Sequence, residues 1–218
     1  MSFFITFEGI EGSGKTTQIK RLTETLRLQG RSVITTREPG GCAIADAIRA
    51  ILLDARNNAL VHRAELLLYA AARAQHVEEV IRPALNQNRI VLCDRFSDAT
   101  LAYQGHGRRL PLDMIRQINA LAADDIQPHL TLLFDLPVKT GLSRAMERIA
   151  RSDGPAEDRF EQESLAFHQR IREGYLELAQ QSPERFRLIR ADAPLQDVTR
   201  QVLSAVNDAL SHNQGDVG

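Results

Sequence analysis

The sequence has few cysteines, few lysines and no long apolar run. Its two cysteines, Cys42 and Cys93, match neither a disulfide framework nor a metal-ligand spacing, so we expect both to pack as small apolar groups. The longest apolar run, Leu66 to Ala72, is far shorter than the ~20 residues of a membrane span. Residues 1–7 lack a basic segment and a small-residue cleavage site, so we expect them to form a first strand. These absences predict a cytoplasmic protein with no membrane partner.

Charge of one sign is not in excess either, because 27 Lys and Arg residues face 28 Asp and Glu residues. This balance argues against a surface-wide nucleic-acid partner, although it leaves room for a local basic site. Only three of the basic residues are lysines, at positions 15, 20 and 139. Base composition explains a bias toward arginine, so the positions of the lysines carry more information than their number.

A chain of 218 residues is long enough for one compact domain with its own core. There is no internal repeat and no linker, so we predict one domain over residues 1–211. The polar stretch around Gly154 and Pro155 predicts a lid at about 148–160, and the polar end of the chain predicts a flexible tail at 212–218.

Short apolar runs alternate with longer helical patterns, which is typical of βαβ units. The expected strands are 3–7, 32–36, 90–93, 130–134 and 186–189. The expected helices are 44–53, 63–87, 97–103, 112–123, 138–149, 161–181 and 196–210. We expect Pro83 to bend or shorten one helix and the Gln-Gly-His-Gly segment 104–107 to separate two others. The fold class predicted is α/β, a doubly wound parallel sheet of five strands with helices on both faces.

A phosphate-binding motif follows the first expected strand. Residues 9–16, Gly-Ile-Glu-Gly-Ser-Gly-Lys-Thr, fit G-x-x-x-x-G-K-[ST] at every fixed position. Backbone N–H groups of such a loop wrap phosphate oxygens, and the following helix adds its positive N-terminus. Lys15 would reach the β- and γ-phosphates, and the Thr16 hydroxyl would bind Mg²⁺. The predicted ATP-binding residues are Gly9, Ile10, Glu11, Gly12, Ser13, Gly14, Lys15, Thr16 and Thr17.

A carboxylate near the metal is also needed, and two expected strands end in one, at Asp94 and Asp135. Ligands of doubly wound sheets bind at the carboxyl ends of strands. Asp94 is followed directly by Arg95, a second group suited to phosphate. We therefore prefer Asp94 as the metal-binding carboxylate and expect Asp135 to be a turn residue.

Several classes of phosphate-loop protein are excluded by missing motifs. Neither Lys20 nor Lys139 lies in the Asn/Thr-Lys-x-Asp segment of a GTPase, and no Leu-Ser-Gly-Gly-Gln segment of a transporter ATPase is present. Small kinases remain. Arg37 and Arg95 follow expected strands and suit anionic substrates, while Arg148 and Arg151 border the predicted lid.

Two pairs at helical i,i+4 spacing are suited to reading a base. Tyr69 and Arg73 would supply a stacking ring and a hydrogen-bond donor, and Thr100 and Gln104 would supply groups that donate and accept. A tyrosine on an apolar helix face is by itself more often part of the core. The two pairs are therefore evidence for a base-binding site only in combination with the motifs around them.

Together these segments resemble the thymidylate kinases along nearly the whole chain. The resemblance rests on Phe-Glu-Gly-Ile-Glu-Gly-Ser-Gly-Lys-Thr-Thr (7–17), Thr-Arg-Glu-Pro-Gly-Gly (36–41), Leu-Tyr-Ala-Ala-Ala-Arg (68–73), Asp-Arg-Phe (94–96), Ala-Tyr-Gln-Gly (102–105) and Asp-Arg-Phe-Glu (158–161). It implies a five-stranded parallel sheet, ATP with Mg²⁺ as cofactor, transfer to dTMP giving dTDP, and a homodimer.

The resemblance also implies roles for the residues that lie outside the phosphate loop. Glu11 would bind the 3′-hydroxyl, Arg37 and Arg95 the dTMP phosphate, and Tyr103 would crowd the 2′ position. For the thymine base, the resemblance implies that Tyr69 stacks on the ring and that Arg73 donates to O4. It also implies that the other pair, Thr100 and Gln104, contacts the N3 edge.

The loop has no arginine at positions 10–13, which resembles bacterial members that supply a catalytic arginine from the lid. Arg148 and Arg151 both remain candidates for that role. With Lys15 and Arg95 they form the set of candidate catalytic residues, which would stabilise charge during direct in-line transfer. Because the acceptor is already anionic, no strong general base is expected.

Two other functions remain open from the sequence. A kinase for another nucleoside monophosphate would keep the loop and the lid but differ at Tyr69, Arg73 and Gln104. A non-catalytic nucleotide-binding module would use the lid as an interaction loop. The release of ADP across a panel of nucleoside monophosphates separates all three.

Overall fold

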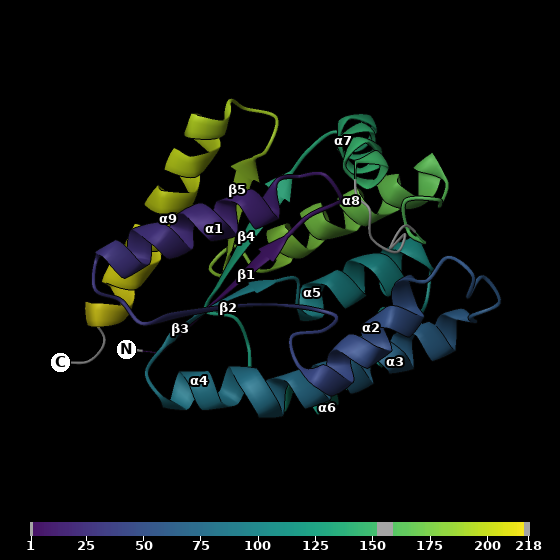
Figure 1. Ribbon diagram of the computed structural model, residues 1–218, viewed down its shortest axis with the longest axis horizontal. Helices are drawn as coiled ribbons and strands as arrows, with labels where there is room; N and C mark the ends of the chain where they lie inside the picture. The colour runs from purple at the N-terminus through teal and green to yellow at the C-terminus, as the bar shows by residue number, and fades with distance from the viewer. Residues whose placement is uncertain (1, 152–158, 216–218) are drawn as a thin grey trace.

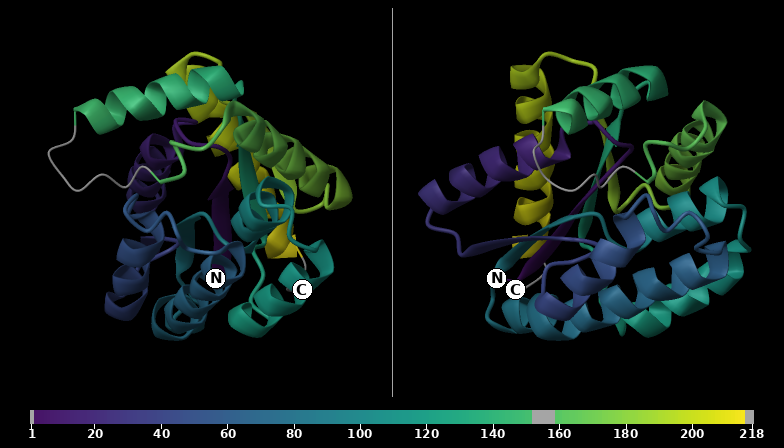
Figure 2. Two further views of the ribbon diagram at one scale, coloured as in Figure 1. Left: turned by 90° about the vertical axis from the view of Figure 1, so that its right-hand side faces the viewer. Right: turned by 45° about the vertical axis from the view of Figure 1, so that its right-hand side comes forward.

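The computed structural model describes the backbone of residues 2–151 and 159–215. Five parallel strands form one sheet in the order β2-β3-β1-β4-β5, with helices on both faces (Figures 1 and 2). The strands are β1 (Phe3–Glu8), β2 (Val33–Arg37), β3 (Ile90–Asp94), β4 (Leu130–Asp135) and β5 (Phe186–Arg190). The predicted fold class, a doubly wound parallel sheet, is confirmed.

Alternating side chains of β1 divide the core into two layers. Phe3, Ile5 and Phe7 belong to the cluster that includes the buried side chains of α1 (Lys15–Leu28) and α9 (Leu195–Gly215). Phe4 points the opposite way, into a cluster with Ile81 of the π-helix η1 (Val77–Ile81). All four side chains are buried, as expected for a parallel strand covered on both faces.

The long crossover between β2 and β3 is built from several helices. They are α2 (Ala43–Leu53), α3 (His62–His76), η1 and α4 (Arg82–Asn86). Pro83 lies at the start of α4, directly after the π-helix. Because proline lacks the N–H of a normal helical bond, a wider turn just before it is a local way of accommodating the break.

The segment Gln-Gly-His-Gly does not separate two helices, so the expected boundary there is wrong. A short α5 (Ser97–Thr100) continues into the π-helix η2 (Leu101–Gly107), which contains the whole segment, and α6 (Leu112–Ala123) follows. A Cβ at Gly105 would lie 2.4 Å from Leu112, and one at Gly107 would lie 2.8 Å from Phe167. The glycines therefore allow close packing rather than ending the helix.

The region of the predicted lid is described only in part. Helix α7 (Val138–Ala150) ends before it, and helix α8 (Leu165–Gln181) begins after it at Ser164, whose hydroxyl caps the backbone of Phe167. Residues 152–158 lie outside the described residues. At the other end, α9 continues to Gly215, beyond the predicted start of a tail, and residues 216–218 lie outside the described residues.

The strand register brings the candidate residues together at one edge of the sheet. Phe7 of β1 and Arg37 of β2 both pair with Asp94 of β3, so the three carboxyl ends are level. The phosphate loop leaves β1 at this level. Across residues 2–151 and 159–215, no helix has both the length and the apolar character needed to cross a membrane.

Candidate active site

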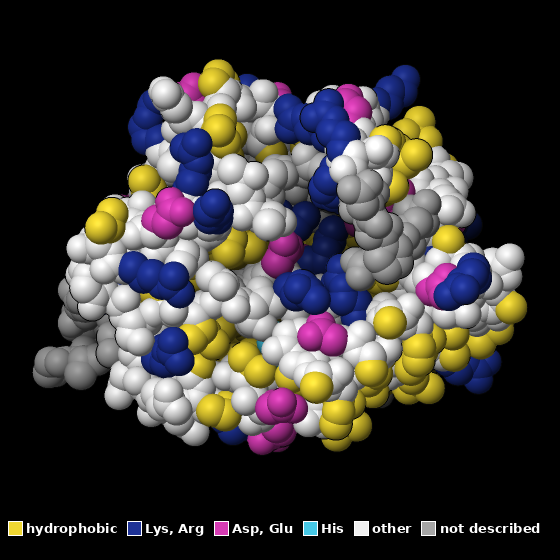
Figure 3. All heavy atoms as spheres, viewed as in Figure 1, with side chains coloured by type: hydrophobic (Ala, Val, Ile, Leu, Met, Phe, Trp, Pro, Cys, Tyr) yellow, Lys and Arg dark blue, Asp and Glu magenta, His cyan; other side chains and the backbone are white. Residues whose placement is uncertain are grey.

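A cavity of about 1320 Å³ opens at the carboxyl ends of β1, β2 and β3. The phosphate loop, η2, helices α3 and α7, and residues Phe160 and Glu161 complete its walls. Lys and Arg side chains gather in the hollow (Figure 3). Pockets for one ligand usually enclose about 300–1,000 Å³, so this cavity has room for two nucleotide-sized molecules side by side.

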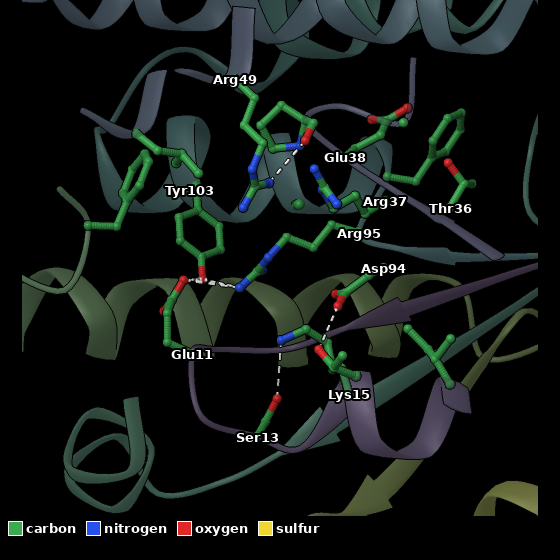
Figure 4. Close-up of a pocket in the computed structure, with 18 of the residues that line it drawn as sticks. Glu11, Ser13, Lys15, Thr36, Arg37, Glu38, Arg49, Asp94, Arg95 and Tyr103 are labelled. Carbon is green, nitrogen blue, oxygen red and sulfur yellow. Dashed lines mark hydrogen bonds and ion pairs between the residues drawn. The ribbon is translucent and has the colours of Figure 1, made fainter. Parts of the chain in front are cut away.

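The phosphate loop depends on close backbone packing. Gly12 has φ +70°, and a Cβ there would lie 2.1 Å from the carbonyl oxygen of Gly141 in α7. Gly14, with φ +87°, forms the N-cap of α1. Lys15 Nζ donates to the carbonyl oxygens of Gly9 at 3.1 Å and Ile10 at 3.0 Å, and to the Ser13 hydroxyl at 3.3 Å (the last bond is drawn in Figure 4). The ammonium group of Lys15 is thus held against the carbonyl oxygens of the loop.

Lys15 keeps its positive charge at neutral pH. Burial and the neighbouring Arg95 lower the pKa of Lys15 to about 8, while Asp94 and Glu11 act in the opposite direction. An ammonium group surrounded by loop oxygens is the point charge that phosphate oxygens need.

Thr16 and Asp94 form the pair expected at a metal site. The Thr16 hydroxyl donates to Asp94 Oδ2 at 3.2 Å, which joins the start of α1 to the end of β3. Two hard oxygen donors suit Mg²⁺, which binds few protein ligands and completes its shell with water and phosphate oxygens. Asp135, the alternative carboxylate, instead makes a two-pronged ion pair with Arg172 at 2.6 and 2.9 Å.

Arg95 occupies the middle of the cavity, with the backbone φ of +70° that places it just past β3. Its guanidinium donates to Glu11 Oε1 at 3.0 Å and to the Tyr103 hydroxyl at 2.9 Å (Figure 4), and also to the Tyr175 hydroxyl at 3.1 Å. Tyr103 also donates to Glu11 Oε1. Burial alone would raise the pKa of Glu11, but Arg95, His168 and Tyr103 hold it well below its usual range.

Arg37 extends from the end of β2 toward the same space as Arg95 (Figure 4). It bonds to Asp46 at 3.1 Å and is 54% exposed. The side chain of Arg95 is therefore more constrained than that of Arg37, because Arg95 has three hydrogen-bond partners and Arg37 has one surface ion pair. Both predicted anion-binding arginines line one cavity.

The four residues expected to read a base also line this cavity: Tyr69, Arg73, Thr100 and Gln104. Arg73 is almost fully buried and is oriented by Glu38 at 2.8 Å and Asn119 at 2.7 Å. Its Nη2 donates to the carbonyl of Phe96 and to the Thr100 hydroxyl. No sequence pattern indicates this buried support, since Glu38 and Asn119 come from distant segments.

The two lid arginines occupy different positions. Arg148 lines the cavity and lies 3.5 Å from Glu161, whereas Arg151 is not among the lining residues and lies 4.0 Å from Glu147 on the same helix turn. Burial, followed by the charge of Glu11, raises the pKa of Glu161. Of the two candidates, the structure brings Arg148 to the cavity.

Sequence reasoning missed several residues of the cavity wall. Arg49 of α2 donates to the Pro39 carbonyl at 3.0 Å and faces the same hollow as Arg37 (Figure 4). Phe160 lies 5.5 Å from the Tyr103 ring and 6.5 Å from the Tyr69 ring, between centroids. One arginine among 24 carries no sequence signal of a site, and Phe160 lies in the Asp-Arg-Phe-Glu segment (158–161), to which the sequence reasoning assigned no contact.

His168, in the first turn of α8, was also missed. The Nδ1 atom of its buried ring lies 3.6 Å from Glu11 Oε2. Within the described residues, neither ring nitrogen nor that oxygen has a hydrogen-bond partner. A lone histidine in a helix has no distinguishing pattern, so only the fold places it behind Glu11.

Glu8, the last residue of β1, supports Arg95 from below. Its Oε2 accepts from the Tyr175 hydroxyl at 2.7 Å, and its Oε1 accepts from the backbone N–H of Phe96 at 2.7 Å. Burial, followed by the nearby charge of Asp98, raises the pKa of Glu8 to about 7. Tyr175 thus links the buried carboxyl group of Glu8 to the guanidinium in the cavity.

Comparison with known proteins identifies the family. A family model described as Thymidylate kinase matches residues 7–202. The chain belongs to the thymidylate kinase family. Thymidylate kinase from Syntrophotalea carbinolica is 60% identical over 97% of this chain and 98% of its own length. Thymidylate kinase from Geobacter sulfurreducens is 58% identical over 96% of this chain and 97% of its own length.

A solved structure of the same family has a similar fold. The crystal structure of thymidylate kinase from Ehrlichia chaffeensis matches with a TM-score of 0.74 and 34% identity, covering 94% of this chain and 98% of that one. The match of the thymidylate kinase model includes every candidate residue from Gly9 to Arg151. The resemblance expected from the motifs is thereby confirmed, and the chain is a kinase that binds nucleotides.

Replacement of Glu8 tests the buried carboxyl group through stability. Because folding raises its pKa from 4.5 to about 7, the folded state binds more protons than the unfolded state, and stability falls as pH rises across that interval. We expect Glu8→Gln to remove this loss, so that its free energy of unfolding relative to the parent rises by about 2.5 kcal/mol from pH 5 to pH 8. Urea unfolding at three pH values measures the difference. Glu24→Gln, exposed on α1, is the control; parallel pH profiles for Glu8→Gln and the parent would contradict the assignment.

Proposed function

We propose that this kinase transfers the γ-phosphoryl group of ATP to dTMP, giving ADP and dTDP. The observation that carries the proposal is the pattern of donors and acceptors that faces the base pocket. Arg73 has five guanidinium N–H groups, and its four hydrogen bonds leave one N–H on Nη1 for a ligand. A donor at this point suits a carbonyl oxygen such as thymine O4.

The second part of the pattern is an acceptor. The Gln104 amide nitrogen donates to Glu65 at 2.8 Å, so its carbonyl oxygen is the atom left for a ligand. Thymine presents O4 as an acceptor and N3–H as a donor, whereas cytosine presents the reverse at both positions. An arginine donor beside a glutamine acceptor therefore matches thymine and opposes cytosine. The ring of Tyr69 would stack on the base.

The sugar and phosphate of dTMP have matching groups nearby. Arg37 and Arg95 would bind the phosphate, since guanidinium groups form paired hydrogen bonds with it. Glu11 lines the cavity beside Arg95 and Tyr103, which both bond to its Oε1, and its carboxylate would accept the 3′-hydroxyl. Tyr103 lies beside Glu11 and would leave little space for a 2′-hydroxyl.

The transfer itself would be a direct displacement. An oxygen of the dTMP phosphate attacks the γ-phosphorus as the bond to the β-γ bridging oxygen breaks, and ADP leaves with that electron pair. Lys15 and Arg148 would stabilise the charge on the equatorial oxygens, and Arg95 would hold the attacking phosphate. Thr16 and Asp94 would hold Mg²⁺, which when bound neutralises charge on the ATP phosphates.

A panel of acceptors tests the substrate. With ATP and Mg²⁺ we expect ADP release with dTMP to exceed that with dCMP, dAMP or dGMP by at least about 100-fold in kcat/KM, given the mismatched donors and acceptors. Preference for another nucleotide would favour a different monophosphate kinase, and turnover of none would favour a binding module.

A variant of the phosphate loop tests the role of Lys15. Lys15→Ala should fold normally and lose about 1,000-fold or more in kcat. Near-normal turnover by Lys15→Ala would remove that lysine from the mechanism.

The two lid arginines give a matched pair of variants. We expect Arg148→Ala to lower kcat by about 100-fold, because it removes a cation that faces the cavity, and Arg151→Ala to lower it by less than about threefold. Steady-state kinetics with saturating ATP and dTMP measures both. Equal losses, or a larger loss for Arg151→Ala, would reverse the assignment.

We also propose a cytoplasmic homodimer that contacts its own copy through α2, α3 and α6. Ile51, Leu67 and Leu121 on these helices are 46%, 54% and 84% exposed. Apolar side chains gather over α2 and α3 in Figure 3. A surface of this kind marks a contact with another protein, and a second copy is the partner always present.

Light scattering tests the dimer. Leu67→Glu should shift the molar mass from that of two chains to that of one, because it would bury a charge at the contact. Leu28→Glu, at the end of α1 and 90% exposed, is a control outside this surface and should stay dimeric. A monomeric parent protein, or equal masses for both variants, would contradict the proposal.

A further inference from the structure

Glu65 of α3 holds the amide of Gln104 in one orientation. The fully buried Glu65 accepts a hydrogen bond from Gln104 Nε2 at its Oε1, at 2.8 Å. An ionised carboxylate only accepts, so it must face the NH₂ end of the amide. The carbonyl end of Gln104 accepts no hydrogen bond within the described part of the chain, and Gln104 lines the cavity.

Two arginines keep Glu65 ionised. Arg108 donates to Oε1 at 3.2 Å and to Oε2 at 3.3 Å, and Arg159, near the end of the predicted lid, donates to Oε2 at 2.7 Å. Burial by itself would raise the pKa of Glu65, but Arg108, the Gln104 amide and Arg159 outweigh it and lower that pKa. The group that faces Gln104 is therefore an acceptor at any physiological pH.

We propose that Glu65 is a positioning residue that sets base specificity, by presenting the carbonyl oxygen rather than the NH₂ of Gln104 to the pyrimidine N3. The inference rests on the proposed function. Thymine and uracil carry a proton at N3 and would donate to this oxygen, whereas cytosine carries a lone pair there and would be repelled. A glutamine alone makes no such choice, because rotation about its last torsion exchanges the two ends.

Glu65→Gln should reverse the choice. Oε2 of Glu65 faces two cationic donors, so the carbonyl oxygen of the new amide would take that place and its NH₂ would face Gln104. Gln104 would then turn its own carbonyl toward position 65 and its NH₂ toward the cavity. That arrangement donates to N3 and so matches cytosine at this position, while Arg73 still presents a donor to the 4-amino group.

The experiment measures kcat/KM for dTMP, dUMP and dCMP with parent protein and Glu65→Gln. We expect the ratio of dTMP to dCMP to fall by about 100-fold, with dTMP and dUMP losing in parallel and dCMP gaining in absolute terms. General damage would lower all three substrates together and leave the ratio unchanged. An unchanged ratio in a folded, active Glu65→Gln protein would overturn the proposal.

Two controls separate amide orientation from loss of charge. Arg159→Met removes a charge from the same cluster but leaves the contact between Glu65 and Gln104, so the dTMP to dCMP ratio should stay within about twofold of the parent. In Glu65→Gln with Gln104→Met, the gain in dCMP should vanish, because no amide remains to turn. Relaxed specificity in Arg159→Met, or a persistent dCMP gain in the double variant, would refute the mechanism.

A swap variant keeps the test decisive if Glu65→Gln fails to fold. Glu65→Gln combined with Gln104→Glu retains one buried carboxylate and one amide but places an acceptor toward the base. We expect it to prefer dTMP over dCMP, and the opposite preference would overturn the proposal. If the parent protein itself does not prefer dTMP in the acceptor panel, the proposed function fails first, which is a separate outcome.

Discussion

The contact between Arg95 and Glu11 is the interaction on which the site depends. It joins the phosphate loop to the end of β3, and through the hydroxyls of Tyr103 and Tyr175 it extends to η2 and α8. Separating two such groups inside the protein would leave uncompensated charge, which costs several kcal/mol. Elements far apart in sequence are therefore held in one arrangement before any nucleotide binds, and the cavity is largely formed in advance.

Buried carboxylates serve the same purpose for the other cations and for the base. Glu38 orients Arg73, and Glu65 orients Gln104, while the half-buried Asp94 contacts Thr16 at the proposed metal site. In each pair the acidic group saturates some donors and so determines which donors or acceptors are left for a ligand. The near-zero net charge of the chain thus conceals a cationic cavity whose arginines and amide are positioned by acidic partners.

Irregular helices bring these groups to the cavity. The π-helix η2 places Tyr103 and Gln104 beside the cavity while its glycines pack against α6 and α8. Gly141 of α7 lies so close to the loop that a Cβ would come within 2.6 Å of the Glu11 carbonyl oxygen. Gly141 thus allows the backbones of α7 and the loop to meet, whereas the glycines of η2 make room for side chains of α6 and α8.

The sequence by itself determined the strand order along the chain, the phosphate loop with Lys15 and the family, because these depend on local patterns and fixed spacings. It also selected Asp94 over Asp135, a choice that agrees with the contact to Thr16. Only the tertiary structure decided that Arg148 rather than Arg151 lines the cavity, that the segment at 104–107 continues a helix, and that Glu65 and His168 lie behind the functional groups. Those features depend on contacts between distant segments, where a buried acid or histidine has a role only because of the partner that packing places beside it.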